Sequence, residues 1–150
     1  MARTRQGQLS AADISAAAGA SMKMLRAMWE CGLIPTRGYT SADAVVAKMT
    51  RHVWYAGGAR ALPSDPSGRQ AAEDRAVRAG AMLRRAIMDG EVTPTSRLIV
   101  TLDASADTND LALVGEPWQL LEALSTPGDH LDLAVGAWLA AMTPADRVAA

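Results

Sequence analysis

The chain has 150 residues, of which 49% are hydrophobic, so it has enough apolar side chains for one sizeable core or two small ones and is not a disordered protein. Its single cysteine, Cys31, excludes an internal disulfide and a metal centre built on thiolates. The net charge of −1 hides an uneven distribution. Residues 1–60 hold eight basic and three acidic side chains, whereas residues 98–150 hold one basic and eight acidic side chains. We therefore expect one half to bind a polyanion and the other to avoid it.

No apolar run approaches the ~18–20 residues that a membrane-spanning helix requires. The N-terminus is basic but has no apolar segment of the kind found in signal peptides. We expect a cytoplasmic protein without a membrane partner.

The N-terminal part begins with a basic arm, residues 1–9, followed by signals for two short helices. Ser10 and Asp13 have the spacing of a capping box and begin the first helix. Gly19 lies in a small-residue turn, where a positive φ is easily adopted. Ser21 then has the position of an N-cap for the second helix.

The second predicted helix runs from Met22 to about Cys31 and has two distinct faces. Leu25 and Met28 form its apolar stripe, while Lys23 and Arg26 lie off that stripe. The periodicity therefore predicts that the two basic side chains face solvent.

A short winged segment and a third helix follow. Residues 33–35 are expected to run extended, Arg37 and Gly38 to turn the chain, and Tyr39 to return it. The third helix is predicted over residues 41–55, with a second capping box at its start.

This order of residues resembles the N-terminal domain of the MerR family of winged-helix DNA-binding regulators. The matching residues are Ser10, Asp13, Gly19-Ala20-Ser21, Leu25-Arg26, Gly32-Leu33-Ile34, Arg37, Gly38-Tyr39 and Asp43. The resemblance covers the first third of the chain and implies a winged helix-turn-helix over residues 10–56. Two features depart from the family pattern: Ala27 and Met28 replace two aromatic residues, and the wing is short, as in excisionase-like relatives.

The resemblance also implies which residues contact DNA. The second helix would enter the major groove, and the wing would reach the adjacent groove or its phosphates. Phosphate contacts would supply most of the affinity and base contacts the specificity. The residues expected at this interface are Ser10, Ser21, Lys23, Arg26, Arg37 and Tyr39.

A Gly-, Pro- and Ser-rich stretch, residues 57–68, is predicted to be a linker and a domain boundary. Residues 69–89 then read as a long helix with basic residues in its last turns. Its predicted apolar stripe consists of Val77, Gly80, Leu83 and Ile87.

The remainder, within an acidic domain over residues 69–150, is predicted to contain a β-hairpin and further helices. The hairpin comprises strands 97–102 and 111–114, and helices follow at 118–124 and 131–142. The predicted fold class is therefore α+β and mainly helical.

No catalytic, cofactor-binding or metal-binding group stands out in the sequence. His52 and His130 lack carboxylates or thiols at ligand spacing. Asp103, Asp107 and Asp110 lack the glycine and closing glutamate of a calcium loop. We therefore expect no cofactor and no enzymatic activity.

The leading hypothesis is a sequence-specific DNA-binding regulator that binds double-stranded DNA and forms a homodimer through the C-terminal domain. One alternative is an excisionase-like or partition-type architectural factor. Another is a protein-interaction module that does not bind DNA.

Overall fold

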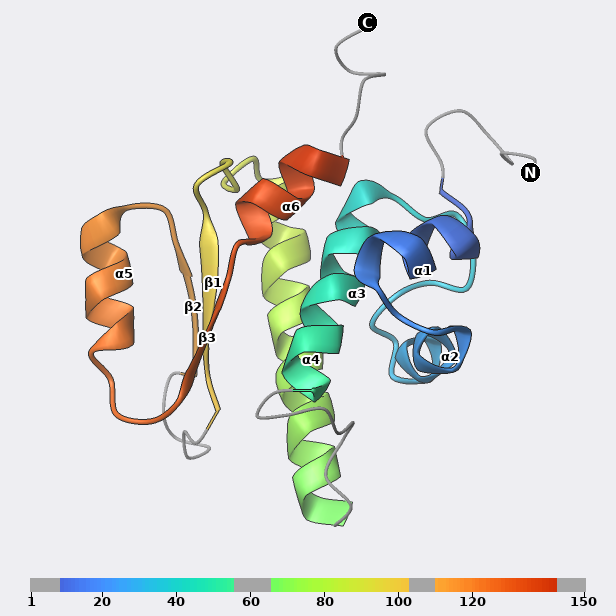
Figure 1. Ribbon diagram of the computed structural model, residues 1–150, viewed down its shortest axis with the longest axis horizontal. Helices are drawn as coiled ribbons and strands as arrows, with labels where there is room; N and C mark the ends of the chain where they lie inside the picture. The colour runs from blue at the N-terminus through green and yellow to red at the C-terminus, as the bar shows by residue number, and fades with distance from the viewer. Residues whose placement is uncertain (1–8, 56–65, 103–109, 143–150) are drawn as a thin grey trace, which may run out of the picture.

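The computed structural model describes residues 9–55, 66–102 and 110–142. It confirms an α+β, mainly helical fold, with six helices and three strands among the described residues. Figure 1 shows the elements as successive layers: α1 and α2, then α3, then the long α4, then the sheet, and finally α5 on its far face. Most of the predicted arm, residues 1–8, lies outside the described residues.

The first three helices begin where the capping signals predicted. They are α1 (Ala11–Ala18), α2 (Met22–Glu30) and α3 (Ser41–Trp54). Ser10 and Asp13 form a reciprocal capping box at α1, and Thr40 and Asp43 form one at α3. These local bonds satisfy amides that have no partner within the helix.

Helix α4 (Pro66–Met88) begins inside the predicted linker, and its buried face agrees with the prediction at Gly80 and Leu83 but not at Val77. Val77 is 40% exposed, whereas the buried positions are mostly alanines. The reason is that α3 and the segment between α2 and α3 lie very close to α4. A Cβ built on Gly80 would lie 3.3 Å from side-chain atoms of both Leu33 and Val46. Only small residues allow two elements to approach this closely, so the alanine face, and not the valine, packs inward.

The predicted boundary between two domains does not divide the core. Buried side chains of α1–α4, the three strands and α6 form one hydrophobic cluster. Arg84 of α4 donates a 2.7 Å hydrogen bond to the Leu33 carbonyl and forms an ion pair with Asp43 at the start of α3. The helices that follow the 57–68 stretch therefore pack directly on the N-terminal helices and complete their core.

The sheet consists of β1 (Arg97–Thr101), β2 (Leu111–Val114) and β3 (His130–Leu133) in the order β2-β1-β3, with both pairings antiparallel. The predicted β1–β2 hairpin is confirmed. The predicted helix over 131–142 is wrong in its first part, because β3 occupies those residues.

Leu131 and Val135 are four residues apart, which suggested one helical face. In the structure Leu133 is buried, Asp132 is exposed, and the chain pairs with β1 before the helix begins. Over such a short stretch, the same apolar residues fit both the alternation of a strand and the spacing of a helix. Hydrogen-bonded pairing with β1 determines that these residues form a strand.

Two short helices complete the fold. Helix α5 (Pro117–Leu124) starts at a proline, as predicted, and α6 (Val135–Met142) returns to the N-terminal helices. Trp138 of α6 stacks on His52, with ring centroids 5.3 Å apart, and Lys48 lies 4.9 Å from the Trp138 ring centroid. Within the described part of the chain, no helix is both long and apolar enough to span a membrane.

Candidate nucleic-acid interface

The turn between α1 and α2 fixes the start of α2. Gly19 ends α1 with φ of +67°, a conformation that glycine adopts without strain. The Ala20 amide donates to the Ser15 carbonyl at 3.1 Å, and the Ser21 hydroxyl accepts from the Met24 amide at 3.1 Å. Because Ala20 is also buried, the first turn of α2 is held at both its backbone and its cap.

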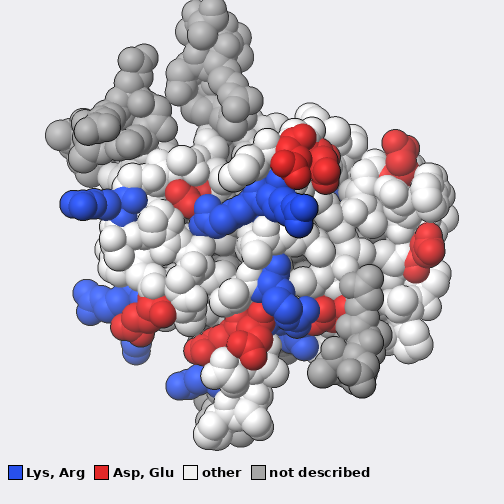
Figure 2. Space-filling model, turned by 180° about the vertical axis from the view of Figure 1, so that it is seen from behind, with Lys and Arg blue, Asp and Glu red and all other residues white. Residues whose placement is uncertain are grey.

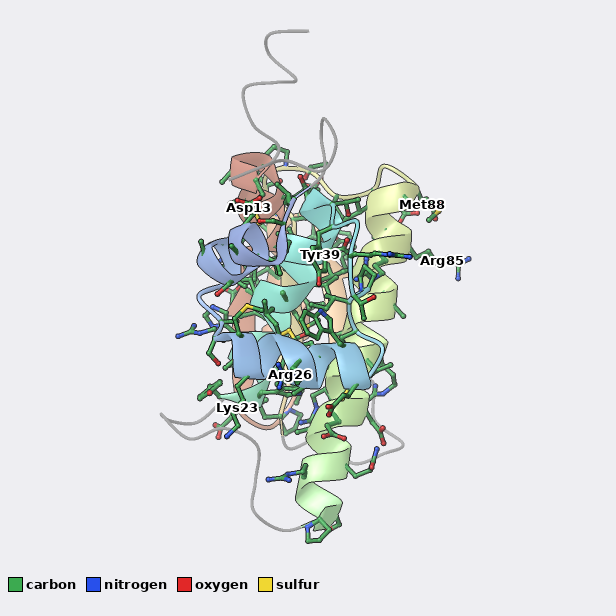
Figure 3. The ribbon with its side chains drawn as sticks, turned by 90° about the vertical axis from the view of Figure 1, so that its right-hand side faces the viewer. Asp13, Lys23, Arg26, Tyr39, Arg85 and Met88 are labelled. Carbon is green, nitrogen blue, oxygen red and sulfur yellow. The ribbon has the colours of Figure 1, made fainter. Side chains whose placement is uncertain are left out.

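Helix α2 is anchored on one side and open on the other. Leu25 and Met28 are completely buried, whereas Lys23 and Arg26 are exposed, as the periodicity predicted. Figure 3 shows the labelled Lys23 and Arg26 on the side of α2 that faces the viewer, away from the core. Neither forms an ion pair with another described residue. Two cations without an ion-pair partner among the described residues therefore lie about one helical turn apart on the outer face of α2.

The two serines named from the sequence both serve as helix caps. Ser10 accepts from the Asp13 amide at 3.1 Å, and Ser21 accepts from the Met24 amide. A serine hydroxyl that accepts a cap bond keeps its own O–H donor. The exposed Ser21 can therefore still donate to a phosphate oxygen at the start of α2.

The predicted wing is a short exposed turn over residues 35–38, and Arg37 lies within it. Like the two basic residues of α2, Arg37 has no ion pair in the described structure. The chain that returns from this turn pairs with the segment before α1, because the Leu9 amide donates to the Tyr39 carbonyl at 2.9 Å.

The position of Tyr39 corrects the sequence-based interface. Its side chain is only 2% exposed, and its hydroxyl accepts a 2.8 Å hydrogen bond from Trp29 Nε1. Burial raises the pKa of this phenol, and the hydrogen bond from Trp29 opposes that effect. The family resemblance implied a DNA contact for Tyr39, but this aromatic ring anchors the turn at residues 35–38 to the core and is not available for such a contact.

Arg51 is a cation that the sequence reasoning did not include. It belongs to α3, yet a Cβ built on Gly19 would lie 3.7 Å from its Nε atom. Its guanidinium therefore lies beside the turn that precedes α2. No local pattern could have indicated this, because 32 positions in the chain separate the glycine from the arginine.

The C-terminal half has the opposite charge. On the face shown in Figure 2, acidic but no basic side chains appear at the right-hand end, where α5 lies. Glu116, Glu122 and Asp129 form no ion pairs with other described residues. This part of the surface would repel a polyanion.

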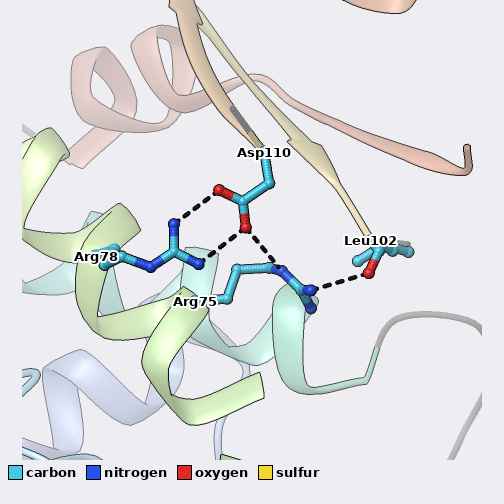
Figure 4. A network of polar contacts seen from close by, with 4 residues as sticks. All are labelled: Arg75, Arg78, Leu102 and Asp110. Atoms are coloured by element: carbon cyan, nitrogen blue, oxygen red, sulfur yellow. Dashed lines mark hydrogen bonds and ion pairs between the residues drawn. The ribbon is translucent and has the colours of Figure 1, made fainter. Parts of the chain in front are cut away.

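Asp110 is neutralised by two arginines within the fold, as Figure 4 shows. Arg78 binds both carboxylate oxygens of Asp110, at 2.7 and 2.9 Å, and Arg75 adds a contact of 3.4 Å. Arg75 also donates to the Leu102 carbonyl at 2.9 Å. The hydrogen bonds from Arg78 hold the pKa of Asp110 below its usual value even though burial acts in the other direction. The network fastens α4 to the β1–β2 hairpin.

The residues weighed as metal ligands do not assemble. His52 stacks on Trp138, and His130 lies 2.9 Å from the Thr126 hydroxyl. Of the three aspartates weighed for calcium, Asp110 is bound to arginines and the other two lie outside the described residues. Across the described ranges, no group of three or more His, Cys, Asp or Glu side chains could hold a metal ion.

No family model, curated protein or solved structure matches this chain.

Proposed function

We propose that this protein binds double-stranded DNA through α2, without enzymatic activity, and regulates transcription as a homodimer. The observation that carries the proposal is the pair Lys23 and Arg26, exposed and without ion pairs on the outer face of an anchored helix. A helix presented in this way can enter the major groove, which is wide enough to admit it.

Three further features support this orientation. The Ser21 hydroxyl and the amides of the first turn of α2 form a helix N-terminus, which favours phosphate oxygens. Arg37 and Arg51 add positive charge at the wing and at the α1–α2 turn. The acidic C-terminal half would point away from DNA, so the charge distribution favours one docking face.

The test compares charge removal on α2 with equal charge removal elsewhere. Binding of the full chain to a mixture of genomic fragments is measured by mobility shift and by fluorescence anisotropy over a range of salt concentrations. Lys23→Ala and Arg26→Ala should each weaken binding and reduce the magnitude of the log–log salt slope by about 1.

The matched control is Arg85→Ala on α4. The Arg85 side chain is 87% exposed, and its distance of 4.0 Å from Asp89 makes for a weak pair. Figure 3 shows it extending sideways from α4, away from α2. If Arg85→Ala lowers affinity as much as the α2 variants do, binding follows net charge alone and the proposed face is wrong. If the wild-type chain has no salt-dependent affinity for DNA, the proposal fails and the protein-interaction alternative gains support.

An architectural role is the second candidate, and the shortness of the exposed turn at residues 35–38 favours it. Such a factor changes the path of DNA, whereas a simple operator-binding regulator need not. Selection and sequencing of protected genomic fragments, followed by a fluorescence energy-transfer measurement of DNA bending, separates the two roles.

A further inference from the structure

At the outer edge of β2, no described residue pairs with the backbone groups that point away from the sheet. The Thr101 amide donates to the Asp110 carbonyl at 2.8 Å, so these residues form a hydrogen-bonded antiparallel pair. Bonded and non-bonded pairs alternate along such a ladder, so the amides and carbonyls of Leu111 and Leu113 point away from β1. No described residue pairs with this side of β2, because the sheet order places β2 at the edge.

The other edge strand differs in character. In β3, Asp132 forms an ion pair with Arg97 at 2.6 Å, and His130 contacts the Thr126 hydroxyl. Charged residues on an edge strand discourage pairing with another chain. Strand β2, with the sequence Leu-Ala-Leu-Val, has neither a charge nor a proline. Of the two edges, β2 is therefore the one suited to pairing.

Helix α5 presents a second surface without a partner, next to this edge. It contacts β1 and β2 on the face of the sheet opposite α4, as Figure 1 shows. Trp118 is 63% and Leu121 is 70% exposed, and Trp118 also lines the space between α5 and the sheet. A hollow of about 320 Å³ lies between α5 and the sheet, and its strand residues all come from β1, β2 and Asp110, which directly precedes β2. The unpaired strand and the open side of the helix thus belong to the same region.

We propose that β2 pairs antiparallel with β2 of a second copy, so that two sheets join into one and the two α5 helices lie side by side. A two-fold axis perpendicular to the sheet places both helices on the same face. Strands lie about 4.8 Å apart, so a helix above β1 and β2 has its axis about 5 Å from the two-fold. The two α5 helices would then be about 10 Å apart, close to the 8–10 Å of packed helices. A strand from another protein would pair only with the β2 edge, whereas a second copy would cover both the β2 edge and the exposed side of α5. This choice of partner rests on the proposed dimeric function.

The register follows from the outward-facing groups. With Ala112 on the two-fold axis, Leu111 of each copy bonds to Leu113 of the other. Ala112 then faces its own symmetry mate in a non-bonded pair, in which Cα atoms lie about 4.5 Å apart. A cysteine at this position could form a disulfide across the axis, because bonded cysteines have Cα atoms about 4.4–6.8 Å apart.

The acidic residues of α5 give the interface a salt dependence opposite to that of DNA binding. Glu116 and Glu122 have no ion pairs with other described residues, and dimerisation would bring the two sets together. Salt screens such repulsion between exposed like charges. The dimer should therefore tighten as salt increases, whereas binding to DNA should weaken.

Disulfide trapping on the full chain tests this interface. In a Cys31→Ser background, Ala112→Cys should form a reducible dimer under mild oxidation at micromolar concentration, in at least ten-fold excess over a Met88→Cys control. Met88 is 84% exposed on α4, so random collisions would favour the control. Equal trapping of both variants would overturn the proposed register.

Light scattering on the wild-type chain and on Leu121→Lys keeps the proposal testable without cysteine variants. The wild type should be a dimer, and the variant should dissociate at least ten-fold more readily, since Leu121 lies at the exposed side of α5. If the wild type is a dimer, but Ala112→Cys does not form the disulfide and Leu121→Lys does not weaken the dimer, then the subunits pair through another surface. In that case only this inference fails. A monomer would overturn the dimer itself, while the effect of Lys23→Ala on DNA binding would still decide the DNA proposal.

Discussion

At the start of α6 the backbone of Gly136 lies very close to the turn before β1, and a single methyl group should disturb this contact. A Cβ built on Gly136 would lie 1.9 Å from the Thr93 carbonyl oxygen and 2.8 Å from the Ser96 nitrogen. Unstrained carbon–oxygen contacts begin at about 3.3 Å, so Gly136→Ala forces a shift of more than about 1 Å. The Gly136 amide donates to the Ser96 carbonyl at 2.9 Å, so the shift also strains a hydrogen bond.

The expected cost combines three effects. Overpacking of this kind costs about 1–3 kcal/mol, and the weakened hydrogen bond adds about 1 kcal/mol. The higher helix propensity of alanine returns about 1 kcal/mol. The net loss of about 1–3 kcal/mol corresponds to a fall in melting temperature of about 2–12 °C for a chain of this size.

Thermal unfolding followed by circular dichroism measures this difference. Gly115→Ala is the matched control, because nothing lies within 4 Å of a Cβ built at that position. It should leave the melting temperature within about 2 °C of wild type, or raise it slightly. If Gly136→Ala melts at the same temperature as Gly115→Ala, then α6 does not approach the turn before β1 within the distances given for Gly136.

Three further predictions concern stability and pH. Leu25→Ala should destabilise the full chain by about 2–5 kcal/mol in chemical denaturation, because this side chain is completely buried, and an unchanged midpoint would refute its anchoring role. Asp110 has a lowered pKa in the folded protein, so the stability it contributes with Arg78 is present above its unfolded pKa of about 4 and is lost as the pH falls. Asp110→Asn should therefore flatten the acid side of the stability profile, measured by urea unfolding from pH 7 to 3. Burial also lowers the pKa of His52, so folding should weaken as the pH drops below about 6.5, and His52→Gln should remove that part of the pH dependence of the melting temperature.

Features fixed by neighbouring residues were predictable from the sequence. The caps at Ser10 and Thr40 depend on an acid three residues later, and both formed as expected. The exposure of Lys23 and Arg26 followed from the apolar stripe that includes Leu25, because helical periodicity alone separates the two faces.

Features set by distant partners were not predictable. Tyr39 is held in the core by the hydrogen bond from Trp29 and by the backbone bridge to Leu9, which no local pattern reveals. Strand β3 exists because β1 offers an edge for Leu131 and Leu133 to pair with. The inward face of α4 depends on how closely α3 approaches, and the local sequence contains the more apolar Val77 as a misleading alternative.

The return of α6 to α3 has a consequence for synthesis of the chain on the ribosome. The Ser41 hydroxyl donates to the Met142 carbonyl at 2.8 Å, across 101 positions in the sequence. At translation rates of roughly 5–20 residues per second, roughly 5–20 seconds pass between the emergence of these two residues. During that interval the side of α3 that Trp138 later covers remains open to solvent or to a chaperone. Helix α3 is thus made early but reaches its final packing only after α6 has formed, and nascent chains released before α6 should expose apolar surface and associate.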